Sequence, residues 1–227
     1  MMYPESDLLF GMDDEYLIGS DLLVKPITAP GITEIDMVFP GADIWYDAET
    51  LQLVSSRAPV NGYETVRIMC PIETGAPVYQ RGGSIIPRKM RLRRSAKLMK
   101  TDPYTLFIAL DAYKKASGRL YMDDEETFAH LTSEEYAEAN FFADFSSNAA
   151  TITNSASVGD GWMSSVLNMS TDRAIERIVV MGVDKEPKSI AQDGDEVHFH
   201  FDADSQLLIL RKPYVSAILD WELLIAF

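Results

Sequence analysis

Short apolar runs that alternate with turn-forming residues recur along most of this chain. Six runs are rich in β-branched or aromatic residues and are bounded by turn formers: residues 105–110, 119–122, 149–153, 177–181, 197–201 and 207–210. Runs of this length and composition are typical of β-strands. The N-terminal half has the same pattern, with corners at Pro26, Pro30-Gly31, Pro40-Gly41, Pro59 and Asn61-Gly62. The sequence therefore predicts an all-β protein built from antiparallel β-sandwiches.

Two segments predict hairpins. In residues 78–88, VYQRGGSIIPR, the Gly82-Gly83 pair lets the backbone reverse, so that the apolar runs on either side can pair. The polar residues 202–205 separate two strand-like runs and predict a second hairpin over residues 197–211. One region stays ambiguous, because residues 132–135 resemble a helix capping box whereas residues 140–145 alternate like a strand.

The segment VYQRGGSIIPR resembles the PVFQRGGSIIPR signature of glycoside hydrolase family 31. Further segments resemble that family in the same order along the chain: residues 13–26, 39–41 with 45–47, 118–124 with 127–128, and 210–213 with 220–221. One position departs from the family pattern. The glycine expected after Asp123-Asp124 is Glu125, and glutamate enters positive φ less freely than glycine.

The resemblance implies a domain organisation. Residues 1–18 would be the tail of a catalytic (β/α)8 barrel, residues 19–98 a proximal C-terminal β-domain, and residues 99–227 a distal C-terminal β-sandwich domain. Residues 12–17 could supply a short helical turn that lacks its natural packing partner. We expect the apolar runs 17–18 and 22–24 to join the β-domains to the barrel.

The resemblance also bears on catalysis. Family 31 enzymes are retaining glycosidases, and their Asp nucleophile and Asp acid/base lie on the barrel that precedes the matched part. The Trp-x-Asp-Met-Asn context of the nucleophile is absent from this chain. A retaining mechanism needs two carboxyl groups about 5 Å apart, and no such pair can be assigned here. We therefore assign no catalytic, cofactor-binding or metal-binding residue and expect the isolated chain to be inactive.

Residues 90–95 and 99–107, MRLRRS and MKTDPYTLF, resemble the family members that process N-linked glycans. This resemblance implies a parent that removes terminal α-1,3-linked glucose in the lumen of the endoplasmic reticulum, without a metal or organic cofactor. It also implies a noncatalytic β subunit as a partner, which would supply retention because LLIAF is not a KDEL-type signal. The alternative is a family member that acts on starch-like or lysosomal glucans.

The charge of the chain is unevenly distributed. Its net charge is −15, yet residues 88–100 contain seven basic and no acidic residues. A basic run can indicate nucleic-acid binding or a localisation signal. We favour pairing with acids of the same chain, because the acidic remainder would repel phosphate. No apolar run approaches the roughly 18 residues of a membrane-spanning helix, so no span is expected.

Three candidate sites have simpler structural explanations. Asp123 and Asp124 look like a carboxylate pair, but neighbours on a strand point to opposite faces, which favours turn or edge residues. His198 and His200 would share one strand face, although spacing offers no third metal ligand. Cys70 is the single cysteine and lies beside Pro71 in an apolar run, which predicts a buried structural thiol.

Aromatic residues raise a second functional hypothesis, a carbohydrate-binding β-sandwich module. Exposed rings stack on sugars, and the candidates are Trp45, Tyr46, Trp162 and Trp221. We expect Trp45, Tyr46 and Trp221 to fill cores instead, because they lie in or beside apolar strands. Residues 168–170, Asn-Met-Ser, form a glycosylation sequon, a pattern that also arises by chance.

Overall fold

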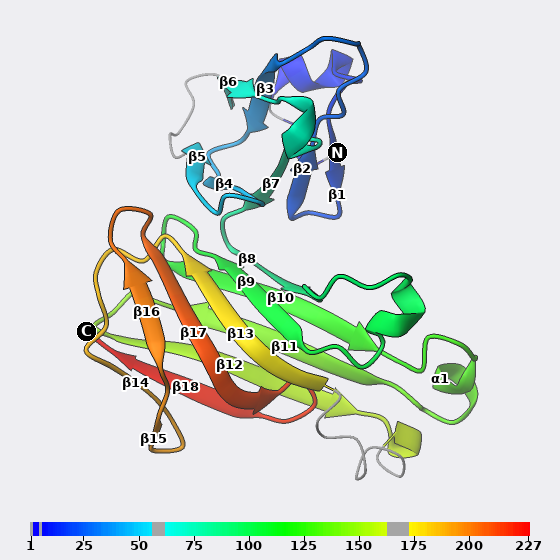
Figure 1. The fold of residues 1–227 in the computed structure, drawn as a ribbon, viewed down its shortest axis with the longest axis vertical. Helices are drawn as coiled ribbons and strands as arrows, with labels where there is room; N and C mark the ends of the chain where they lie inside the picture. The colour runs from blue at the N-terminus through cyan, green and yellow to red at the C-terminus, as the bar shows by residue number, and fades with distance from the viewer. Residues whose placement is uncertain (1, 5, 56–61, 163–172) are drawn as a thin grey trace.

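The computed structural model describes residues 2–4, 6–55, 62–162 and 173–227, and these residues form an all-β protein (Figure 1). Its strands form three sheets. The helical segments are short: η1 (Asp7–Gly11), η2 (Ile72–Thr74), η3 (Ala96–Met99) and α1 (Ala129–Thr132). The predicted all-β class is therefore confirmed. No helix among the described residues is long and apolar enough to cross a membrane.

The N-terminal part forms a small body of two sheets, in the upper part of Figure 1. The five-stranded sheet has the order β1 (Tyr16–Ile18), β2 (Leu22–Val24), β7 (Val78–Arg81), β4 (Trp45–Asp47) and β5 (Leu53–Ser55). The second sheet pairs β3 (Glu34–Pro40) with β6 (Tyr63–Met69). Their facing side chains enclose a core of Leu23, Met37, Phe39, Trp45 and Tyr79.

The remainder forms one sheet of 11 strands that curls into two layers (Figure 1). Its strand order is β15 (Asp195–Glu196), β14 (Ser189–Gln192), β18 (Trp221–Ala226), β12 (Ala149–Val158), β11 (Ala137–Asp144), β10 (Lys115–Met122), β8 (Ser84–Arg88), β9 (Tyr104–Ala109), β13 (Ala174–Met181), β17 (Leu207–Ser216) and β16 (Phe199–Asp202). The inner faces of the two layers enclose the main hydrophobic core.

Alternation of side chains explains how this core forms. In β18, Trp221, Leu223 and Ile225 are buried while the residues between them are exposed, as expected for a strand with one solvated face. Every residue of β9 is buried. Leu106 and Ile108 face the main core, whereas Phe107 and Ala109 face the small body, so β9 is covered on both sides.

One prediction of local structure is confirmed, and one ambiguous region is resolved. Strands β16 and β17 pair antiparallel from Phe199↔Leu210 to Asp202↔Leu207, which forms the hairpin predicted over residues 197–211. The ambiguous region after residue 132 resolves as the strand β11, because α1 ends at Thr132. Two pairs of neighbours run parallel within this otherwise antiparallel sheet, namely β9 with β13 and β8 with β10.

Two other predictions of local structure were wrong. β7 and β8 do not form a hairpin, because β7 pairs with β2 and β4 whereas β8 pairs with β9 and β10. The glycines between them carry the chain from the small body to the large sheet. The helical turn expected over residues 12–17 is also absent from the structure, which instead has η1 before it and β1 at Tyr16–Ile18, paired with β2.

Candidate functional site

The segment that resembled the family signature forms the joint between the two bodies. Gly82 donates its N–H to the Ile44 carbonyl at 2.6 Å, and Gly83 donates to the Ala109 carbonyl at 2.8 Å. A side chain at residue 82 would meet the Leu110 carbonyl oxygen at 2.9 Å, and Gly83 has φ +91°. Glycine is therefore required twice, once for close passage and once for backbone conformation.

A buried glutamine connects the two sheets across this joint. Gln80, on β7, donates from Nε2 to the Phe107 carbonyl on β9 at 3.0 Å and to Ser84 Oγ at 3.1 Å. Ser84 Oγ in turn donates to the Arg81 carbonyl at 2.6 Å. Both side chains are almost fully buried. Buried polar groups need such partners, so these contacts fix the position of β7 relative to β9.

Tyr46 adds an apolar contact with a polar anchor. Its ring, on β4, packs in a cluster with Phe107 and Ala109 of β9 and Val179 and Met181 of β13. Its hydroxyl donates to the Leu110 carbonyl at 2.9 Å. Burial raises the pKa of Tyr46 well above its ordinary value. The phenol therefore stays neutral and serves as a hydrogen-bond donor at the joint.

Residues 88–100 are called the basic connector, and most of its basic residues pair with acids of the same chain, as we predicted. Arg93 binds both carboxylate oxygens of the buried Asp102, at 3.0 and 2.6 Å. These hydrogen bonds hold the pKa of Asp102 below its usual range. Arg91 pairs with Glu176 at 3.0 Å. The connector thus pairs with Asp102, just before β9, and with Glu176, near the start of β13, which limits its freedom to bind phosphate.

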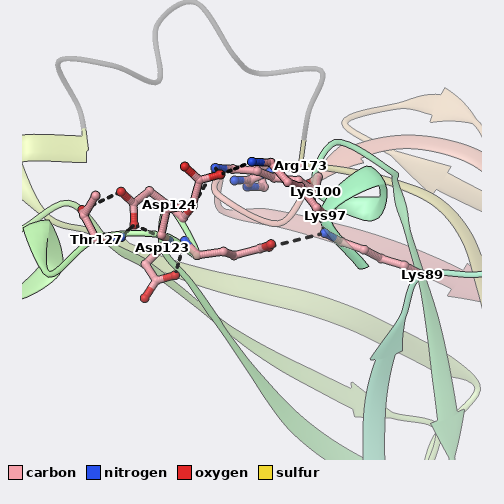
Figure 2. Close-up of polar contacts among 9 residues, drawn as sticks. Lys89, Lys97, Lys100, Asp123, Asp124, Thr127 and Arg173 are labelled. Atoms are coloured by element: carbon pink, nitrogen blue, oxygen red, sulfur yellow. Dashed lines mark hydrogen bonds and ion pairs between the residues drawn. The ribbon is translucent and has the colours of Figure 1, made fainter. Parts of the chain in front are cut away.

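The connector also faces residues 123–127, the acidic turn (Figure 2). Lys100 Nζ donates to the Asp124 carbonyl at 2.5 Å, and the Lys100 carbonyl accepts a hydrogen bond from Arg173 at 3.2 Å. Looser ion pairs join Lys89 to Glu125 at 3.9 Å and Lys97 to Glu126 at 3.6 Å. Connector and turn are therefore held together by charge-assisted contacts from several residues.

The two aspartates of the acidic turn are turn residues, as expected. Asp124 accepts hydrogen bonds from the Thr127 hydroxyl at 2.6 Å and from the backbone N–H groups of Thr127 and Glu126. These donors lower the pKa of Asp124 to about 2. Asp123 accepts from the N–H of Glu125 at 2.8 Å. Glu125 has φ +60°, so it adopts the left-handed conformation where the family pattern has glycine.

The histidines and the cysteine are not brought together. His198 and His200 are both exposed on the outer side of the large sheet, and Cys70 is buried in the small body. No group of three or more His, Cys, Asp or Glu residues in the described ranges could hold a metal ion. Burial of Cys70 agrees with the structural role that we expected.

All three tryptophans fill cores, which confirms the prediction for Trp45 and Trp221. Trp45 is fully buried in the small body, and Trp221 and Trp162 belong to the main core. The Trp221 indole N–H donates to the Ser216 carbonyl at 2.9 Å. None of these three rings is available as a platform for a sugar. Asn168, in the sequon, lies outside the described residues.

Sequence reasoning missed Gln80 as a structural contact; it predicted that the Tyr46 ring fills a core, which is confirmed, but not that its hydroxyl binds across the joint. A clue to Gln80 was available, because it is an uncharged polar residue inside an apolar strand next to the glycine pair. Nothing in the sequence indicated its partner Phe107, which is 27 residues away. We expected residues 22–24 to join the β-domains to the barrel, but Leu23 packs inside the core of the small body.

Residues 1–86 match the family model described as the glycosyl hydrolase family 31 C-terminal domain. The chain is 34% identical over 228 residues to neutral alpha-glucosidase AB of Homo sapiens, covering 98% of this chain and 22% of that protein. It is 38% identical over 219 residues to the protein of the same name from Dictyostelium discoideum, covering 94% of this chain and 21% of the relative. The chain therefore spans about a fifth of the length of these relatives.

Solved structures agree with the sequence relatives. The chain resembles the glucosidase II alpha subunit in its DNJ-bound form with a TM-score of 0.75 and 27% identity, covering 95% of this chain and 24% of that one. A Flavobacterium johnsoniae GH31 dextranase has the same fold at a TM-score of 0.75, with 17% identity over 99% of this chain and 28% of that one. The chain belongs to glycoside hydrolase family 31 and is similar, along nearly its whole length, to the C-terminal region of the glucosidase II alpha subunit.

Proposed function

We propose that this chain is the noncatalytic C-terminal region of a retaining α-glucosidase and supports the catalytic (β/α)8 barrel of the same parent. The parent would remove terminal α-1,3-linked glucose from N-linked glycans in the lumen of the endoplasmic reticulum. Its partner would be a noncatalytic β subunit. Support comes from a similar solved structure, an ER glucosidase II heterodimer of a catalytic subunit and the binding domain of a regulatory subunit. Its identity to this chain is 27% and its TM-score is 0.75, covering 99% of this chain and 24% of that one.

One observation carries the supporting role: an apolar strip near the N-terminal end of the small body. Leu8 and Phe10 on η1 are 45% and 61% exposed, and Tyr16 and Ile18 on β1 are 51% and 54% exposed. No residue of η1 is buried. Exposed apolar residues at several nearby positions of the chain are consistent with an interaction surface. The barrel of the parent is the occupant that the family relationship supplies.

The strip is held in a fixed position by a buried carboxylate. Glu15 accepts a hydrogen bond from Lys25 Nζ at 2.9 Å and another from the Val38 N–H at 3.0 Å. Burial raises the pKa of Glu15, although both hydrogen bonds oppose the shift. Because Glu15 immediately precedes β1, these contacts fix the direction in which Tyr16 and Ile18 point. A fixed strip suits a surface that must position a rigid neighbour.

Strand pairing supports a revised division of the chain. The boundaries predicted at residues 18 and 98 remain a proposal, but β1 pairs within the small sheet and β8 pairs within the large one. We therefore favour a small domain that includes β1 and ends at Gly82-Gly83. The family model agrees with this limit, since its match ends at residue 86.

The test is reconstitution from two chains. The upstream barrel of the parent is produced separately and mixed with this 227-residue chain, and turnover of p-nitrophenyl α-glucoside is measured with copurification. We expect turnover only when both chains are present. Ile18→Ser should lower copurification, whereas Leu224→Ser, a residue on β18 that is also 54% exposed, should not. Turnover by this chain alone, or equal effects of the two variants, would overturn the proposal.

A further inference from the structure

A cleft of about 850 Å³ lies between the small body and the outer face of the large sheet. Its floor includes Ile86, Phe107, Val179 and Ile209, from four adjacent strands, and Met69 lines the side of the small body. This volume lies within the roughly 300–1,000 Å³ of sites that bind small organic groups. The cleft is mainly apolar, so it suits an apolar side chain rather than a sugar.

A row of arginines crosses the same face of the sheet. Strand register places Arg88 beside Thr105, Thr105 beside Arg177, and Arg177 beside Arg211. The adjacent residues Leu106, Ile178 and Leu210 point into the main core. Successive side chains of a strand point to opposite faces, so the arginines point outward. Arg88 and Arg177 also line the cleft, which places the row at its border.

Two arginines of this row have no acidic partner among the described residues. Arg177 and Arg211 are exposed, and no described carboxylate lies within 4.0 Å of either guanidinium. The neighbouring Glu176 already pairs with Arg91 at 3.0 Å. Arg88 is more constrained, since it stacks over Phe107 at 4.6 Å and donates to the Ala48 carbonyl at 3.0 Å. Among the described residues, two guanidinium groups thus lack an acidic partner, although the net charge of the chain is −15.

We propose that this surface binds an acidic peptide segment of a partner protein, with an apolar side chain in the cleft and carboxylates on Arg177 and Arg211. Adjacent strands are about 4.8 Å apart, so Arg177 on β13 and Arg211 on β17 lie one strand spacing apart, with Arg177 lining the cleft. An extended peptide can place successive carboxylates on both arginines and an apolar side chain in the adjoining cleft, whereas a single carboxylate would leave the cleft unfilled. Arginine also binds carboxylates in a two-point geometry.

A polynucleotide fits these features less well. Its phosphates would match the arginines, but its backbone offers no aliphatic group for the cleft, and the acidic remainder of the chain would repel its dense charge. A peptide with a few acids carries less charge and supplies the apolar group. This inference concerns a surface away from the apolar strip, and it stands or fails independently of the parent's activity.

The probe is a fluorescein-labelled peptide, Glu-Glu-Leu-Phe-Glu-Glu, titrated with the 227-residue chain and followed by fluorescence anisotropy. We expect binding that weakens about tenfold or more in the double variant Arg177→Glu/Arg211→Glu. The control Arg94→Glu alters an exposed arginine of the basic connector and should leave the affinity unchanged. Circular dichroism of each variant establishes that it is folded.

Two further probes separate the alternatives. Glu-Glu-Ser-Ser-Glu-Glu keeps the charge and removes the apolar groups, so we expect it to bind at least tenfold more weakly. A 20-nucleotide single-stranded oligothymidine should bind more weakly than the first peptide. No binding of Glu-Glu-Leu-Phe-Glu-Glu, equal binding of the two peptides, or tighter binding of the oligonucleotide would each overturn the proposal.

Discussion

Replacement of Gln80 by leucine tests the joint directly. Leucine has nearly the same size but no donor, so Gln80→Leu removes the hydrogen bonds from Nε2 to the Phe107 carbonyl at 3.0 Å and to Ser84 Oγ at 3.1 Å. Each buried hydrogen bond contributes about 1 kcal/mol net. We therefore expect a loss of about 2 kcal/mol in the free energy of unfolding. For a chain of this length, that loss lowers Tm by about 4–8 °C.

The assay is differential scanning calorimetry together with urea unfolding followed by circular dichroism. The matched control is Gln52→Leu, because Gln52 is exposed in the small body. Surface substitutions of this kind change stability by about 0.5 kcal/mol or less. The difference between the two variants therefore isolates the buried contacts from the general effect of exchanging glutamine for leucine.

Two results would refute this account of the joint. If Gln80→Leu were as stable as the native chain within about 0.5 kcal/mol, the hydrogen bonds would contribute nothing that leucine packing does not replace. If both variants lost the same stability, the effect would come from the exchange itself and not from the bridge between β7 and β9.

Three other predictions follow from the same structure. Gly182 has φ +84° and faces Tyr46, so Gly182→Ala should lower the free energy of unfolding by at least about 1–2 kcal/mol from backbone strain alone. Adding Tyr46→Phe removes the oxygen that the new methyl group would meet, so the combined loss measured by urea unfolding should be smaller than the sum of the single losses. Additive losses would contradict the contact. Thr127→Val removes the largest cause of the low pKa of Asp124, about 2, so carboxyl ¹³C NMR should show that pKa rising toward its ordinary value near 4. Because the pKa of Asp124 is depressed in the folded state, its stabilisation is present at pH values above its ordinary pKa and is lost as the pH falls toward 2. In Thr127→Val that stabilisation should shrink. An unchanged pKa would contradict the assignment. Asp102→Asn should speed trypsin cleavage within residues 88–100, because it frees Arg93. The control Asp195→Asn, at an exposed position, should not change the cleavage rate. Equal rates in the two variants would show that pairing with Asp102 does not protect this segment from trypsin.

Local patterns predicted the strands well because the two faces of a strand differ in burial. The alternation in β18 and the turn between β16 and β17 are both properties of neighbouring residues. Pairing partners are not local. The Gly82-Gly83 pair would allow either a hairpin or a passage of the chain from one sheet to the other. The pairing of β8 with β9 decides between them, and the residues of β9 lie some 20 positions further along the chain.

The candidate sites divide in the same way. The acidic turn could be predicted because Asp side chains that cap nearby N–H groups are a short-range feature. The arginine row could not, because Arg88, Arg177 and Arg211 become neighbours only through the register of β8, β9, β13 and β17. Strand register is set by packing over the whole sheet, so it cannot be predicted from the sequence of one strand.

The order of strands in the small body explains how the apolar strip can act on the rest of the molecule. β1, which contains Tyr16 and Ile18, pairs with β2, and β2 pairs with β7. β7 ends at Arg81, directly before the joint, where Gln80 connects it to β9. A neighbour bound at the strip is therefore linked to the large sheet through two hydrogen-bonded strand pairs and the joint. If the strip binds the barrel as we propose, Gln80→Leu should weaken the link between the barrel and the large sheet even though the strip itself is unchanged.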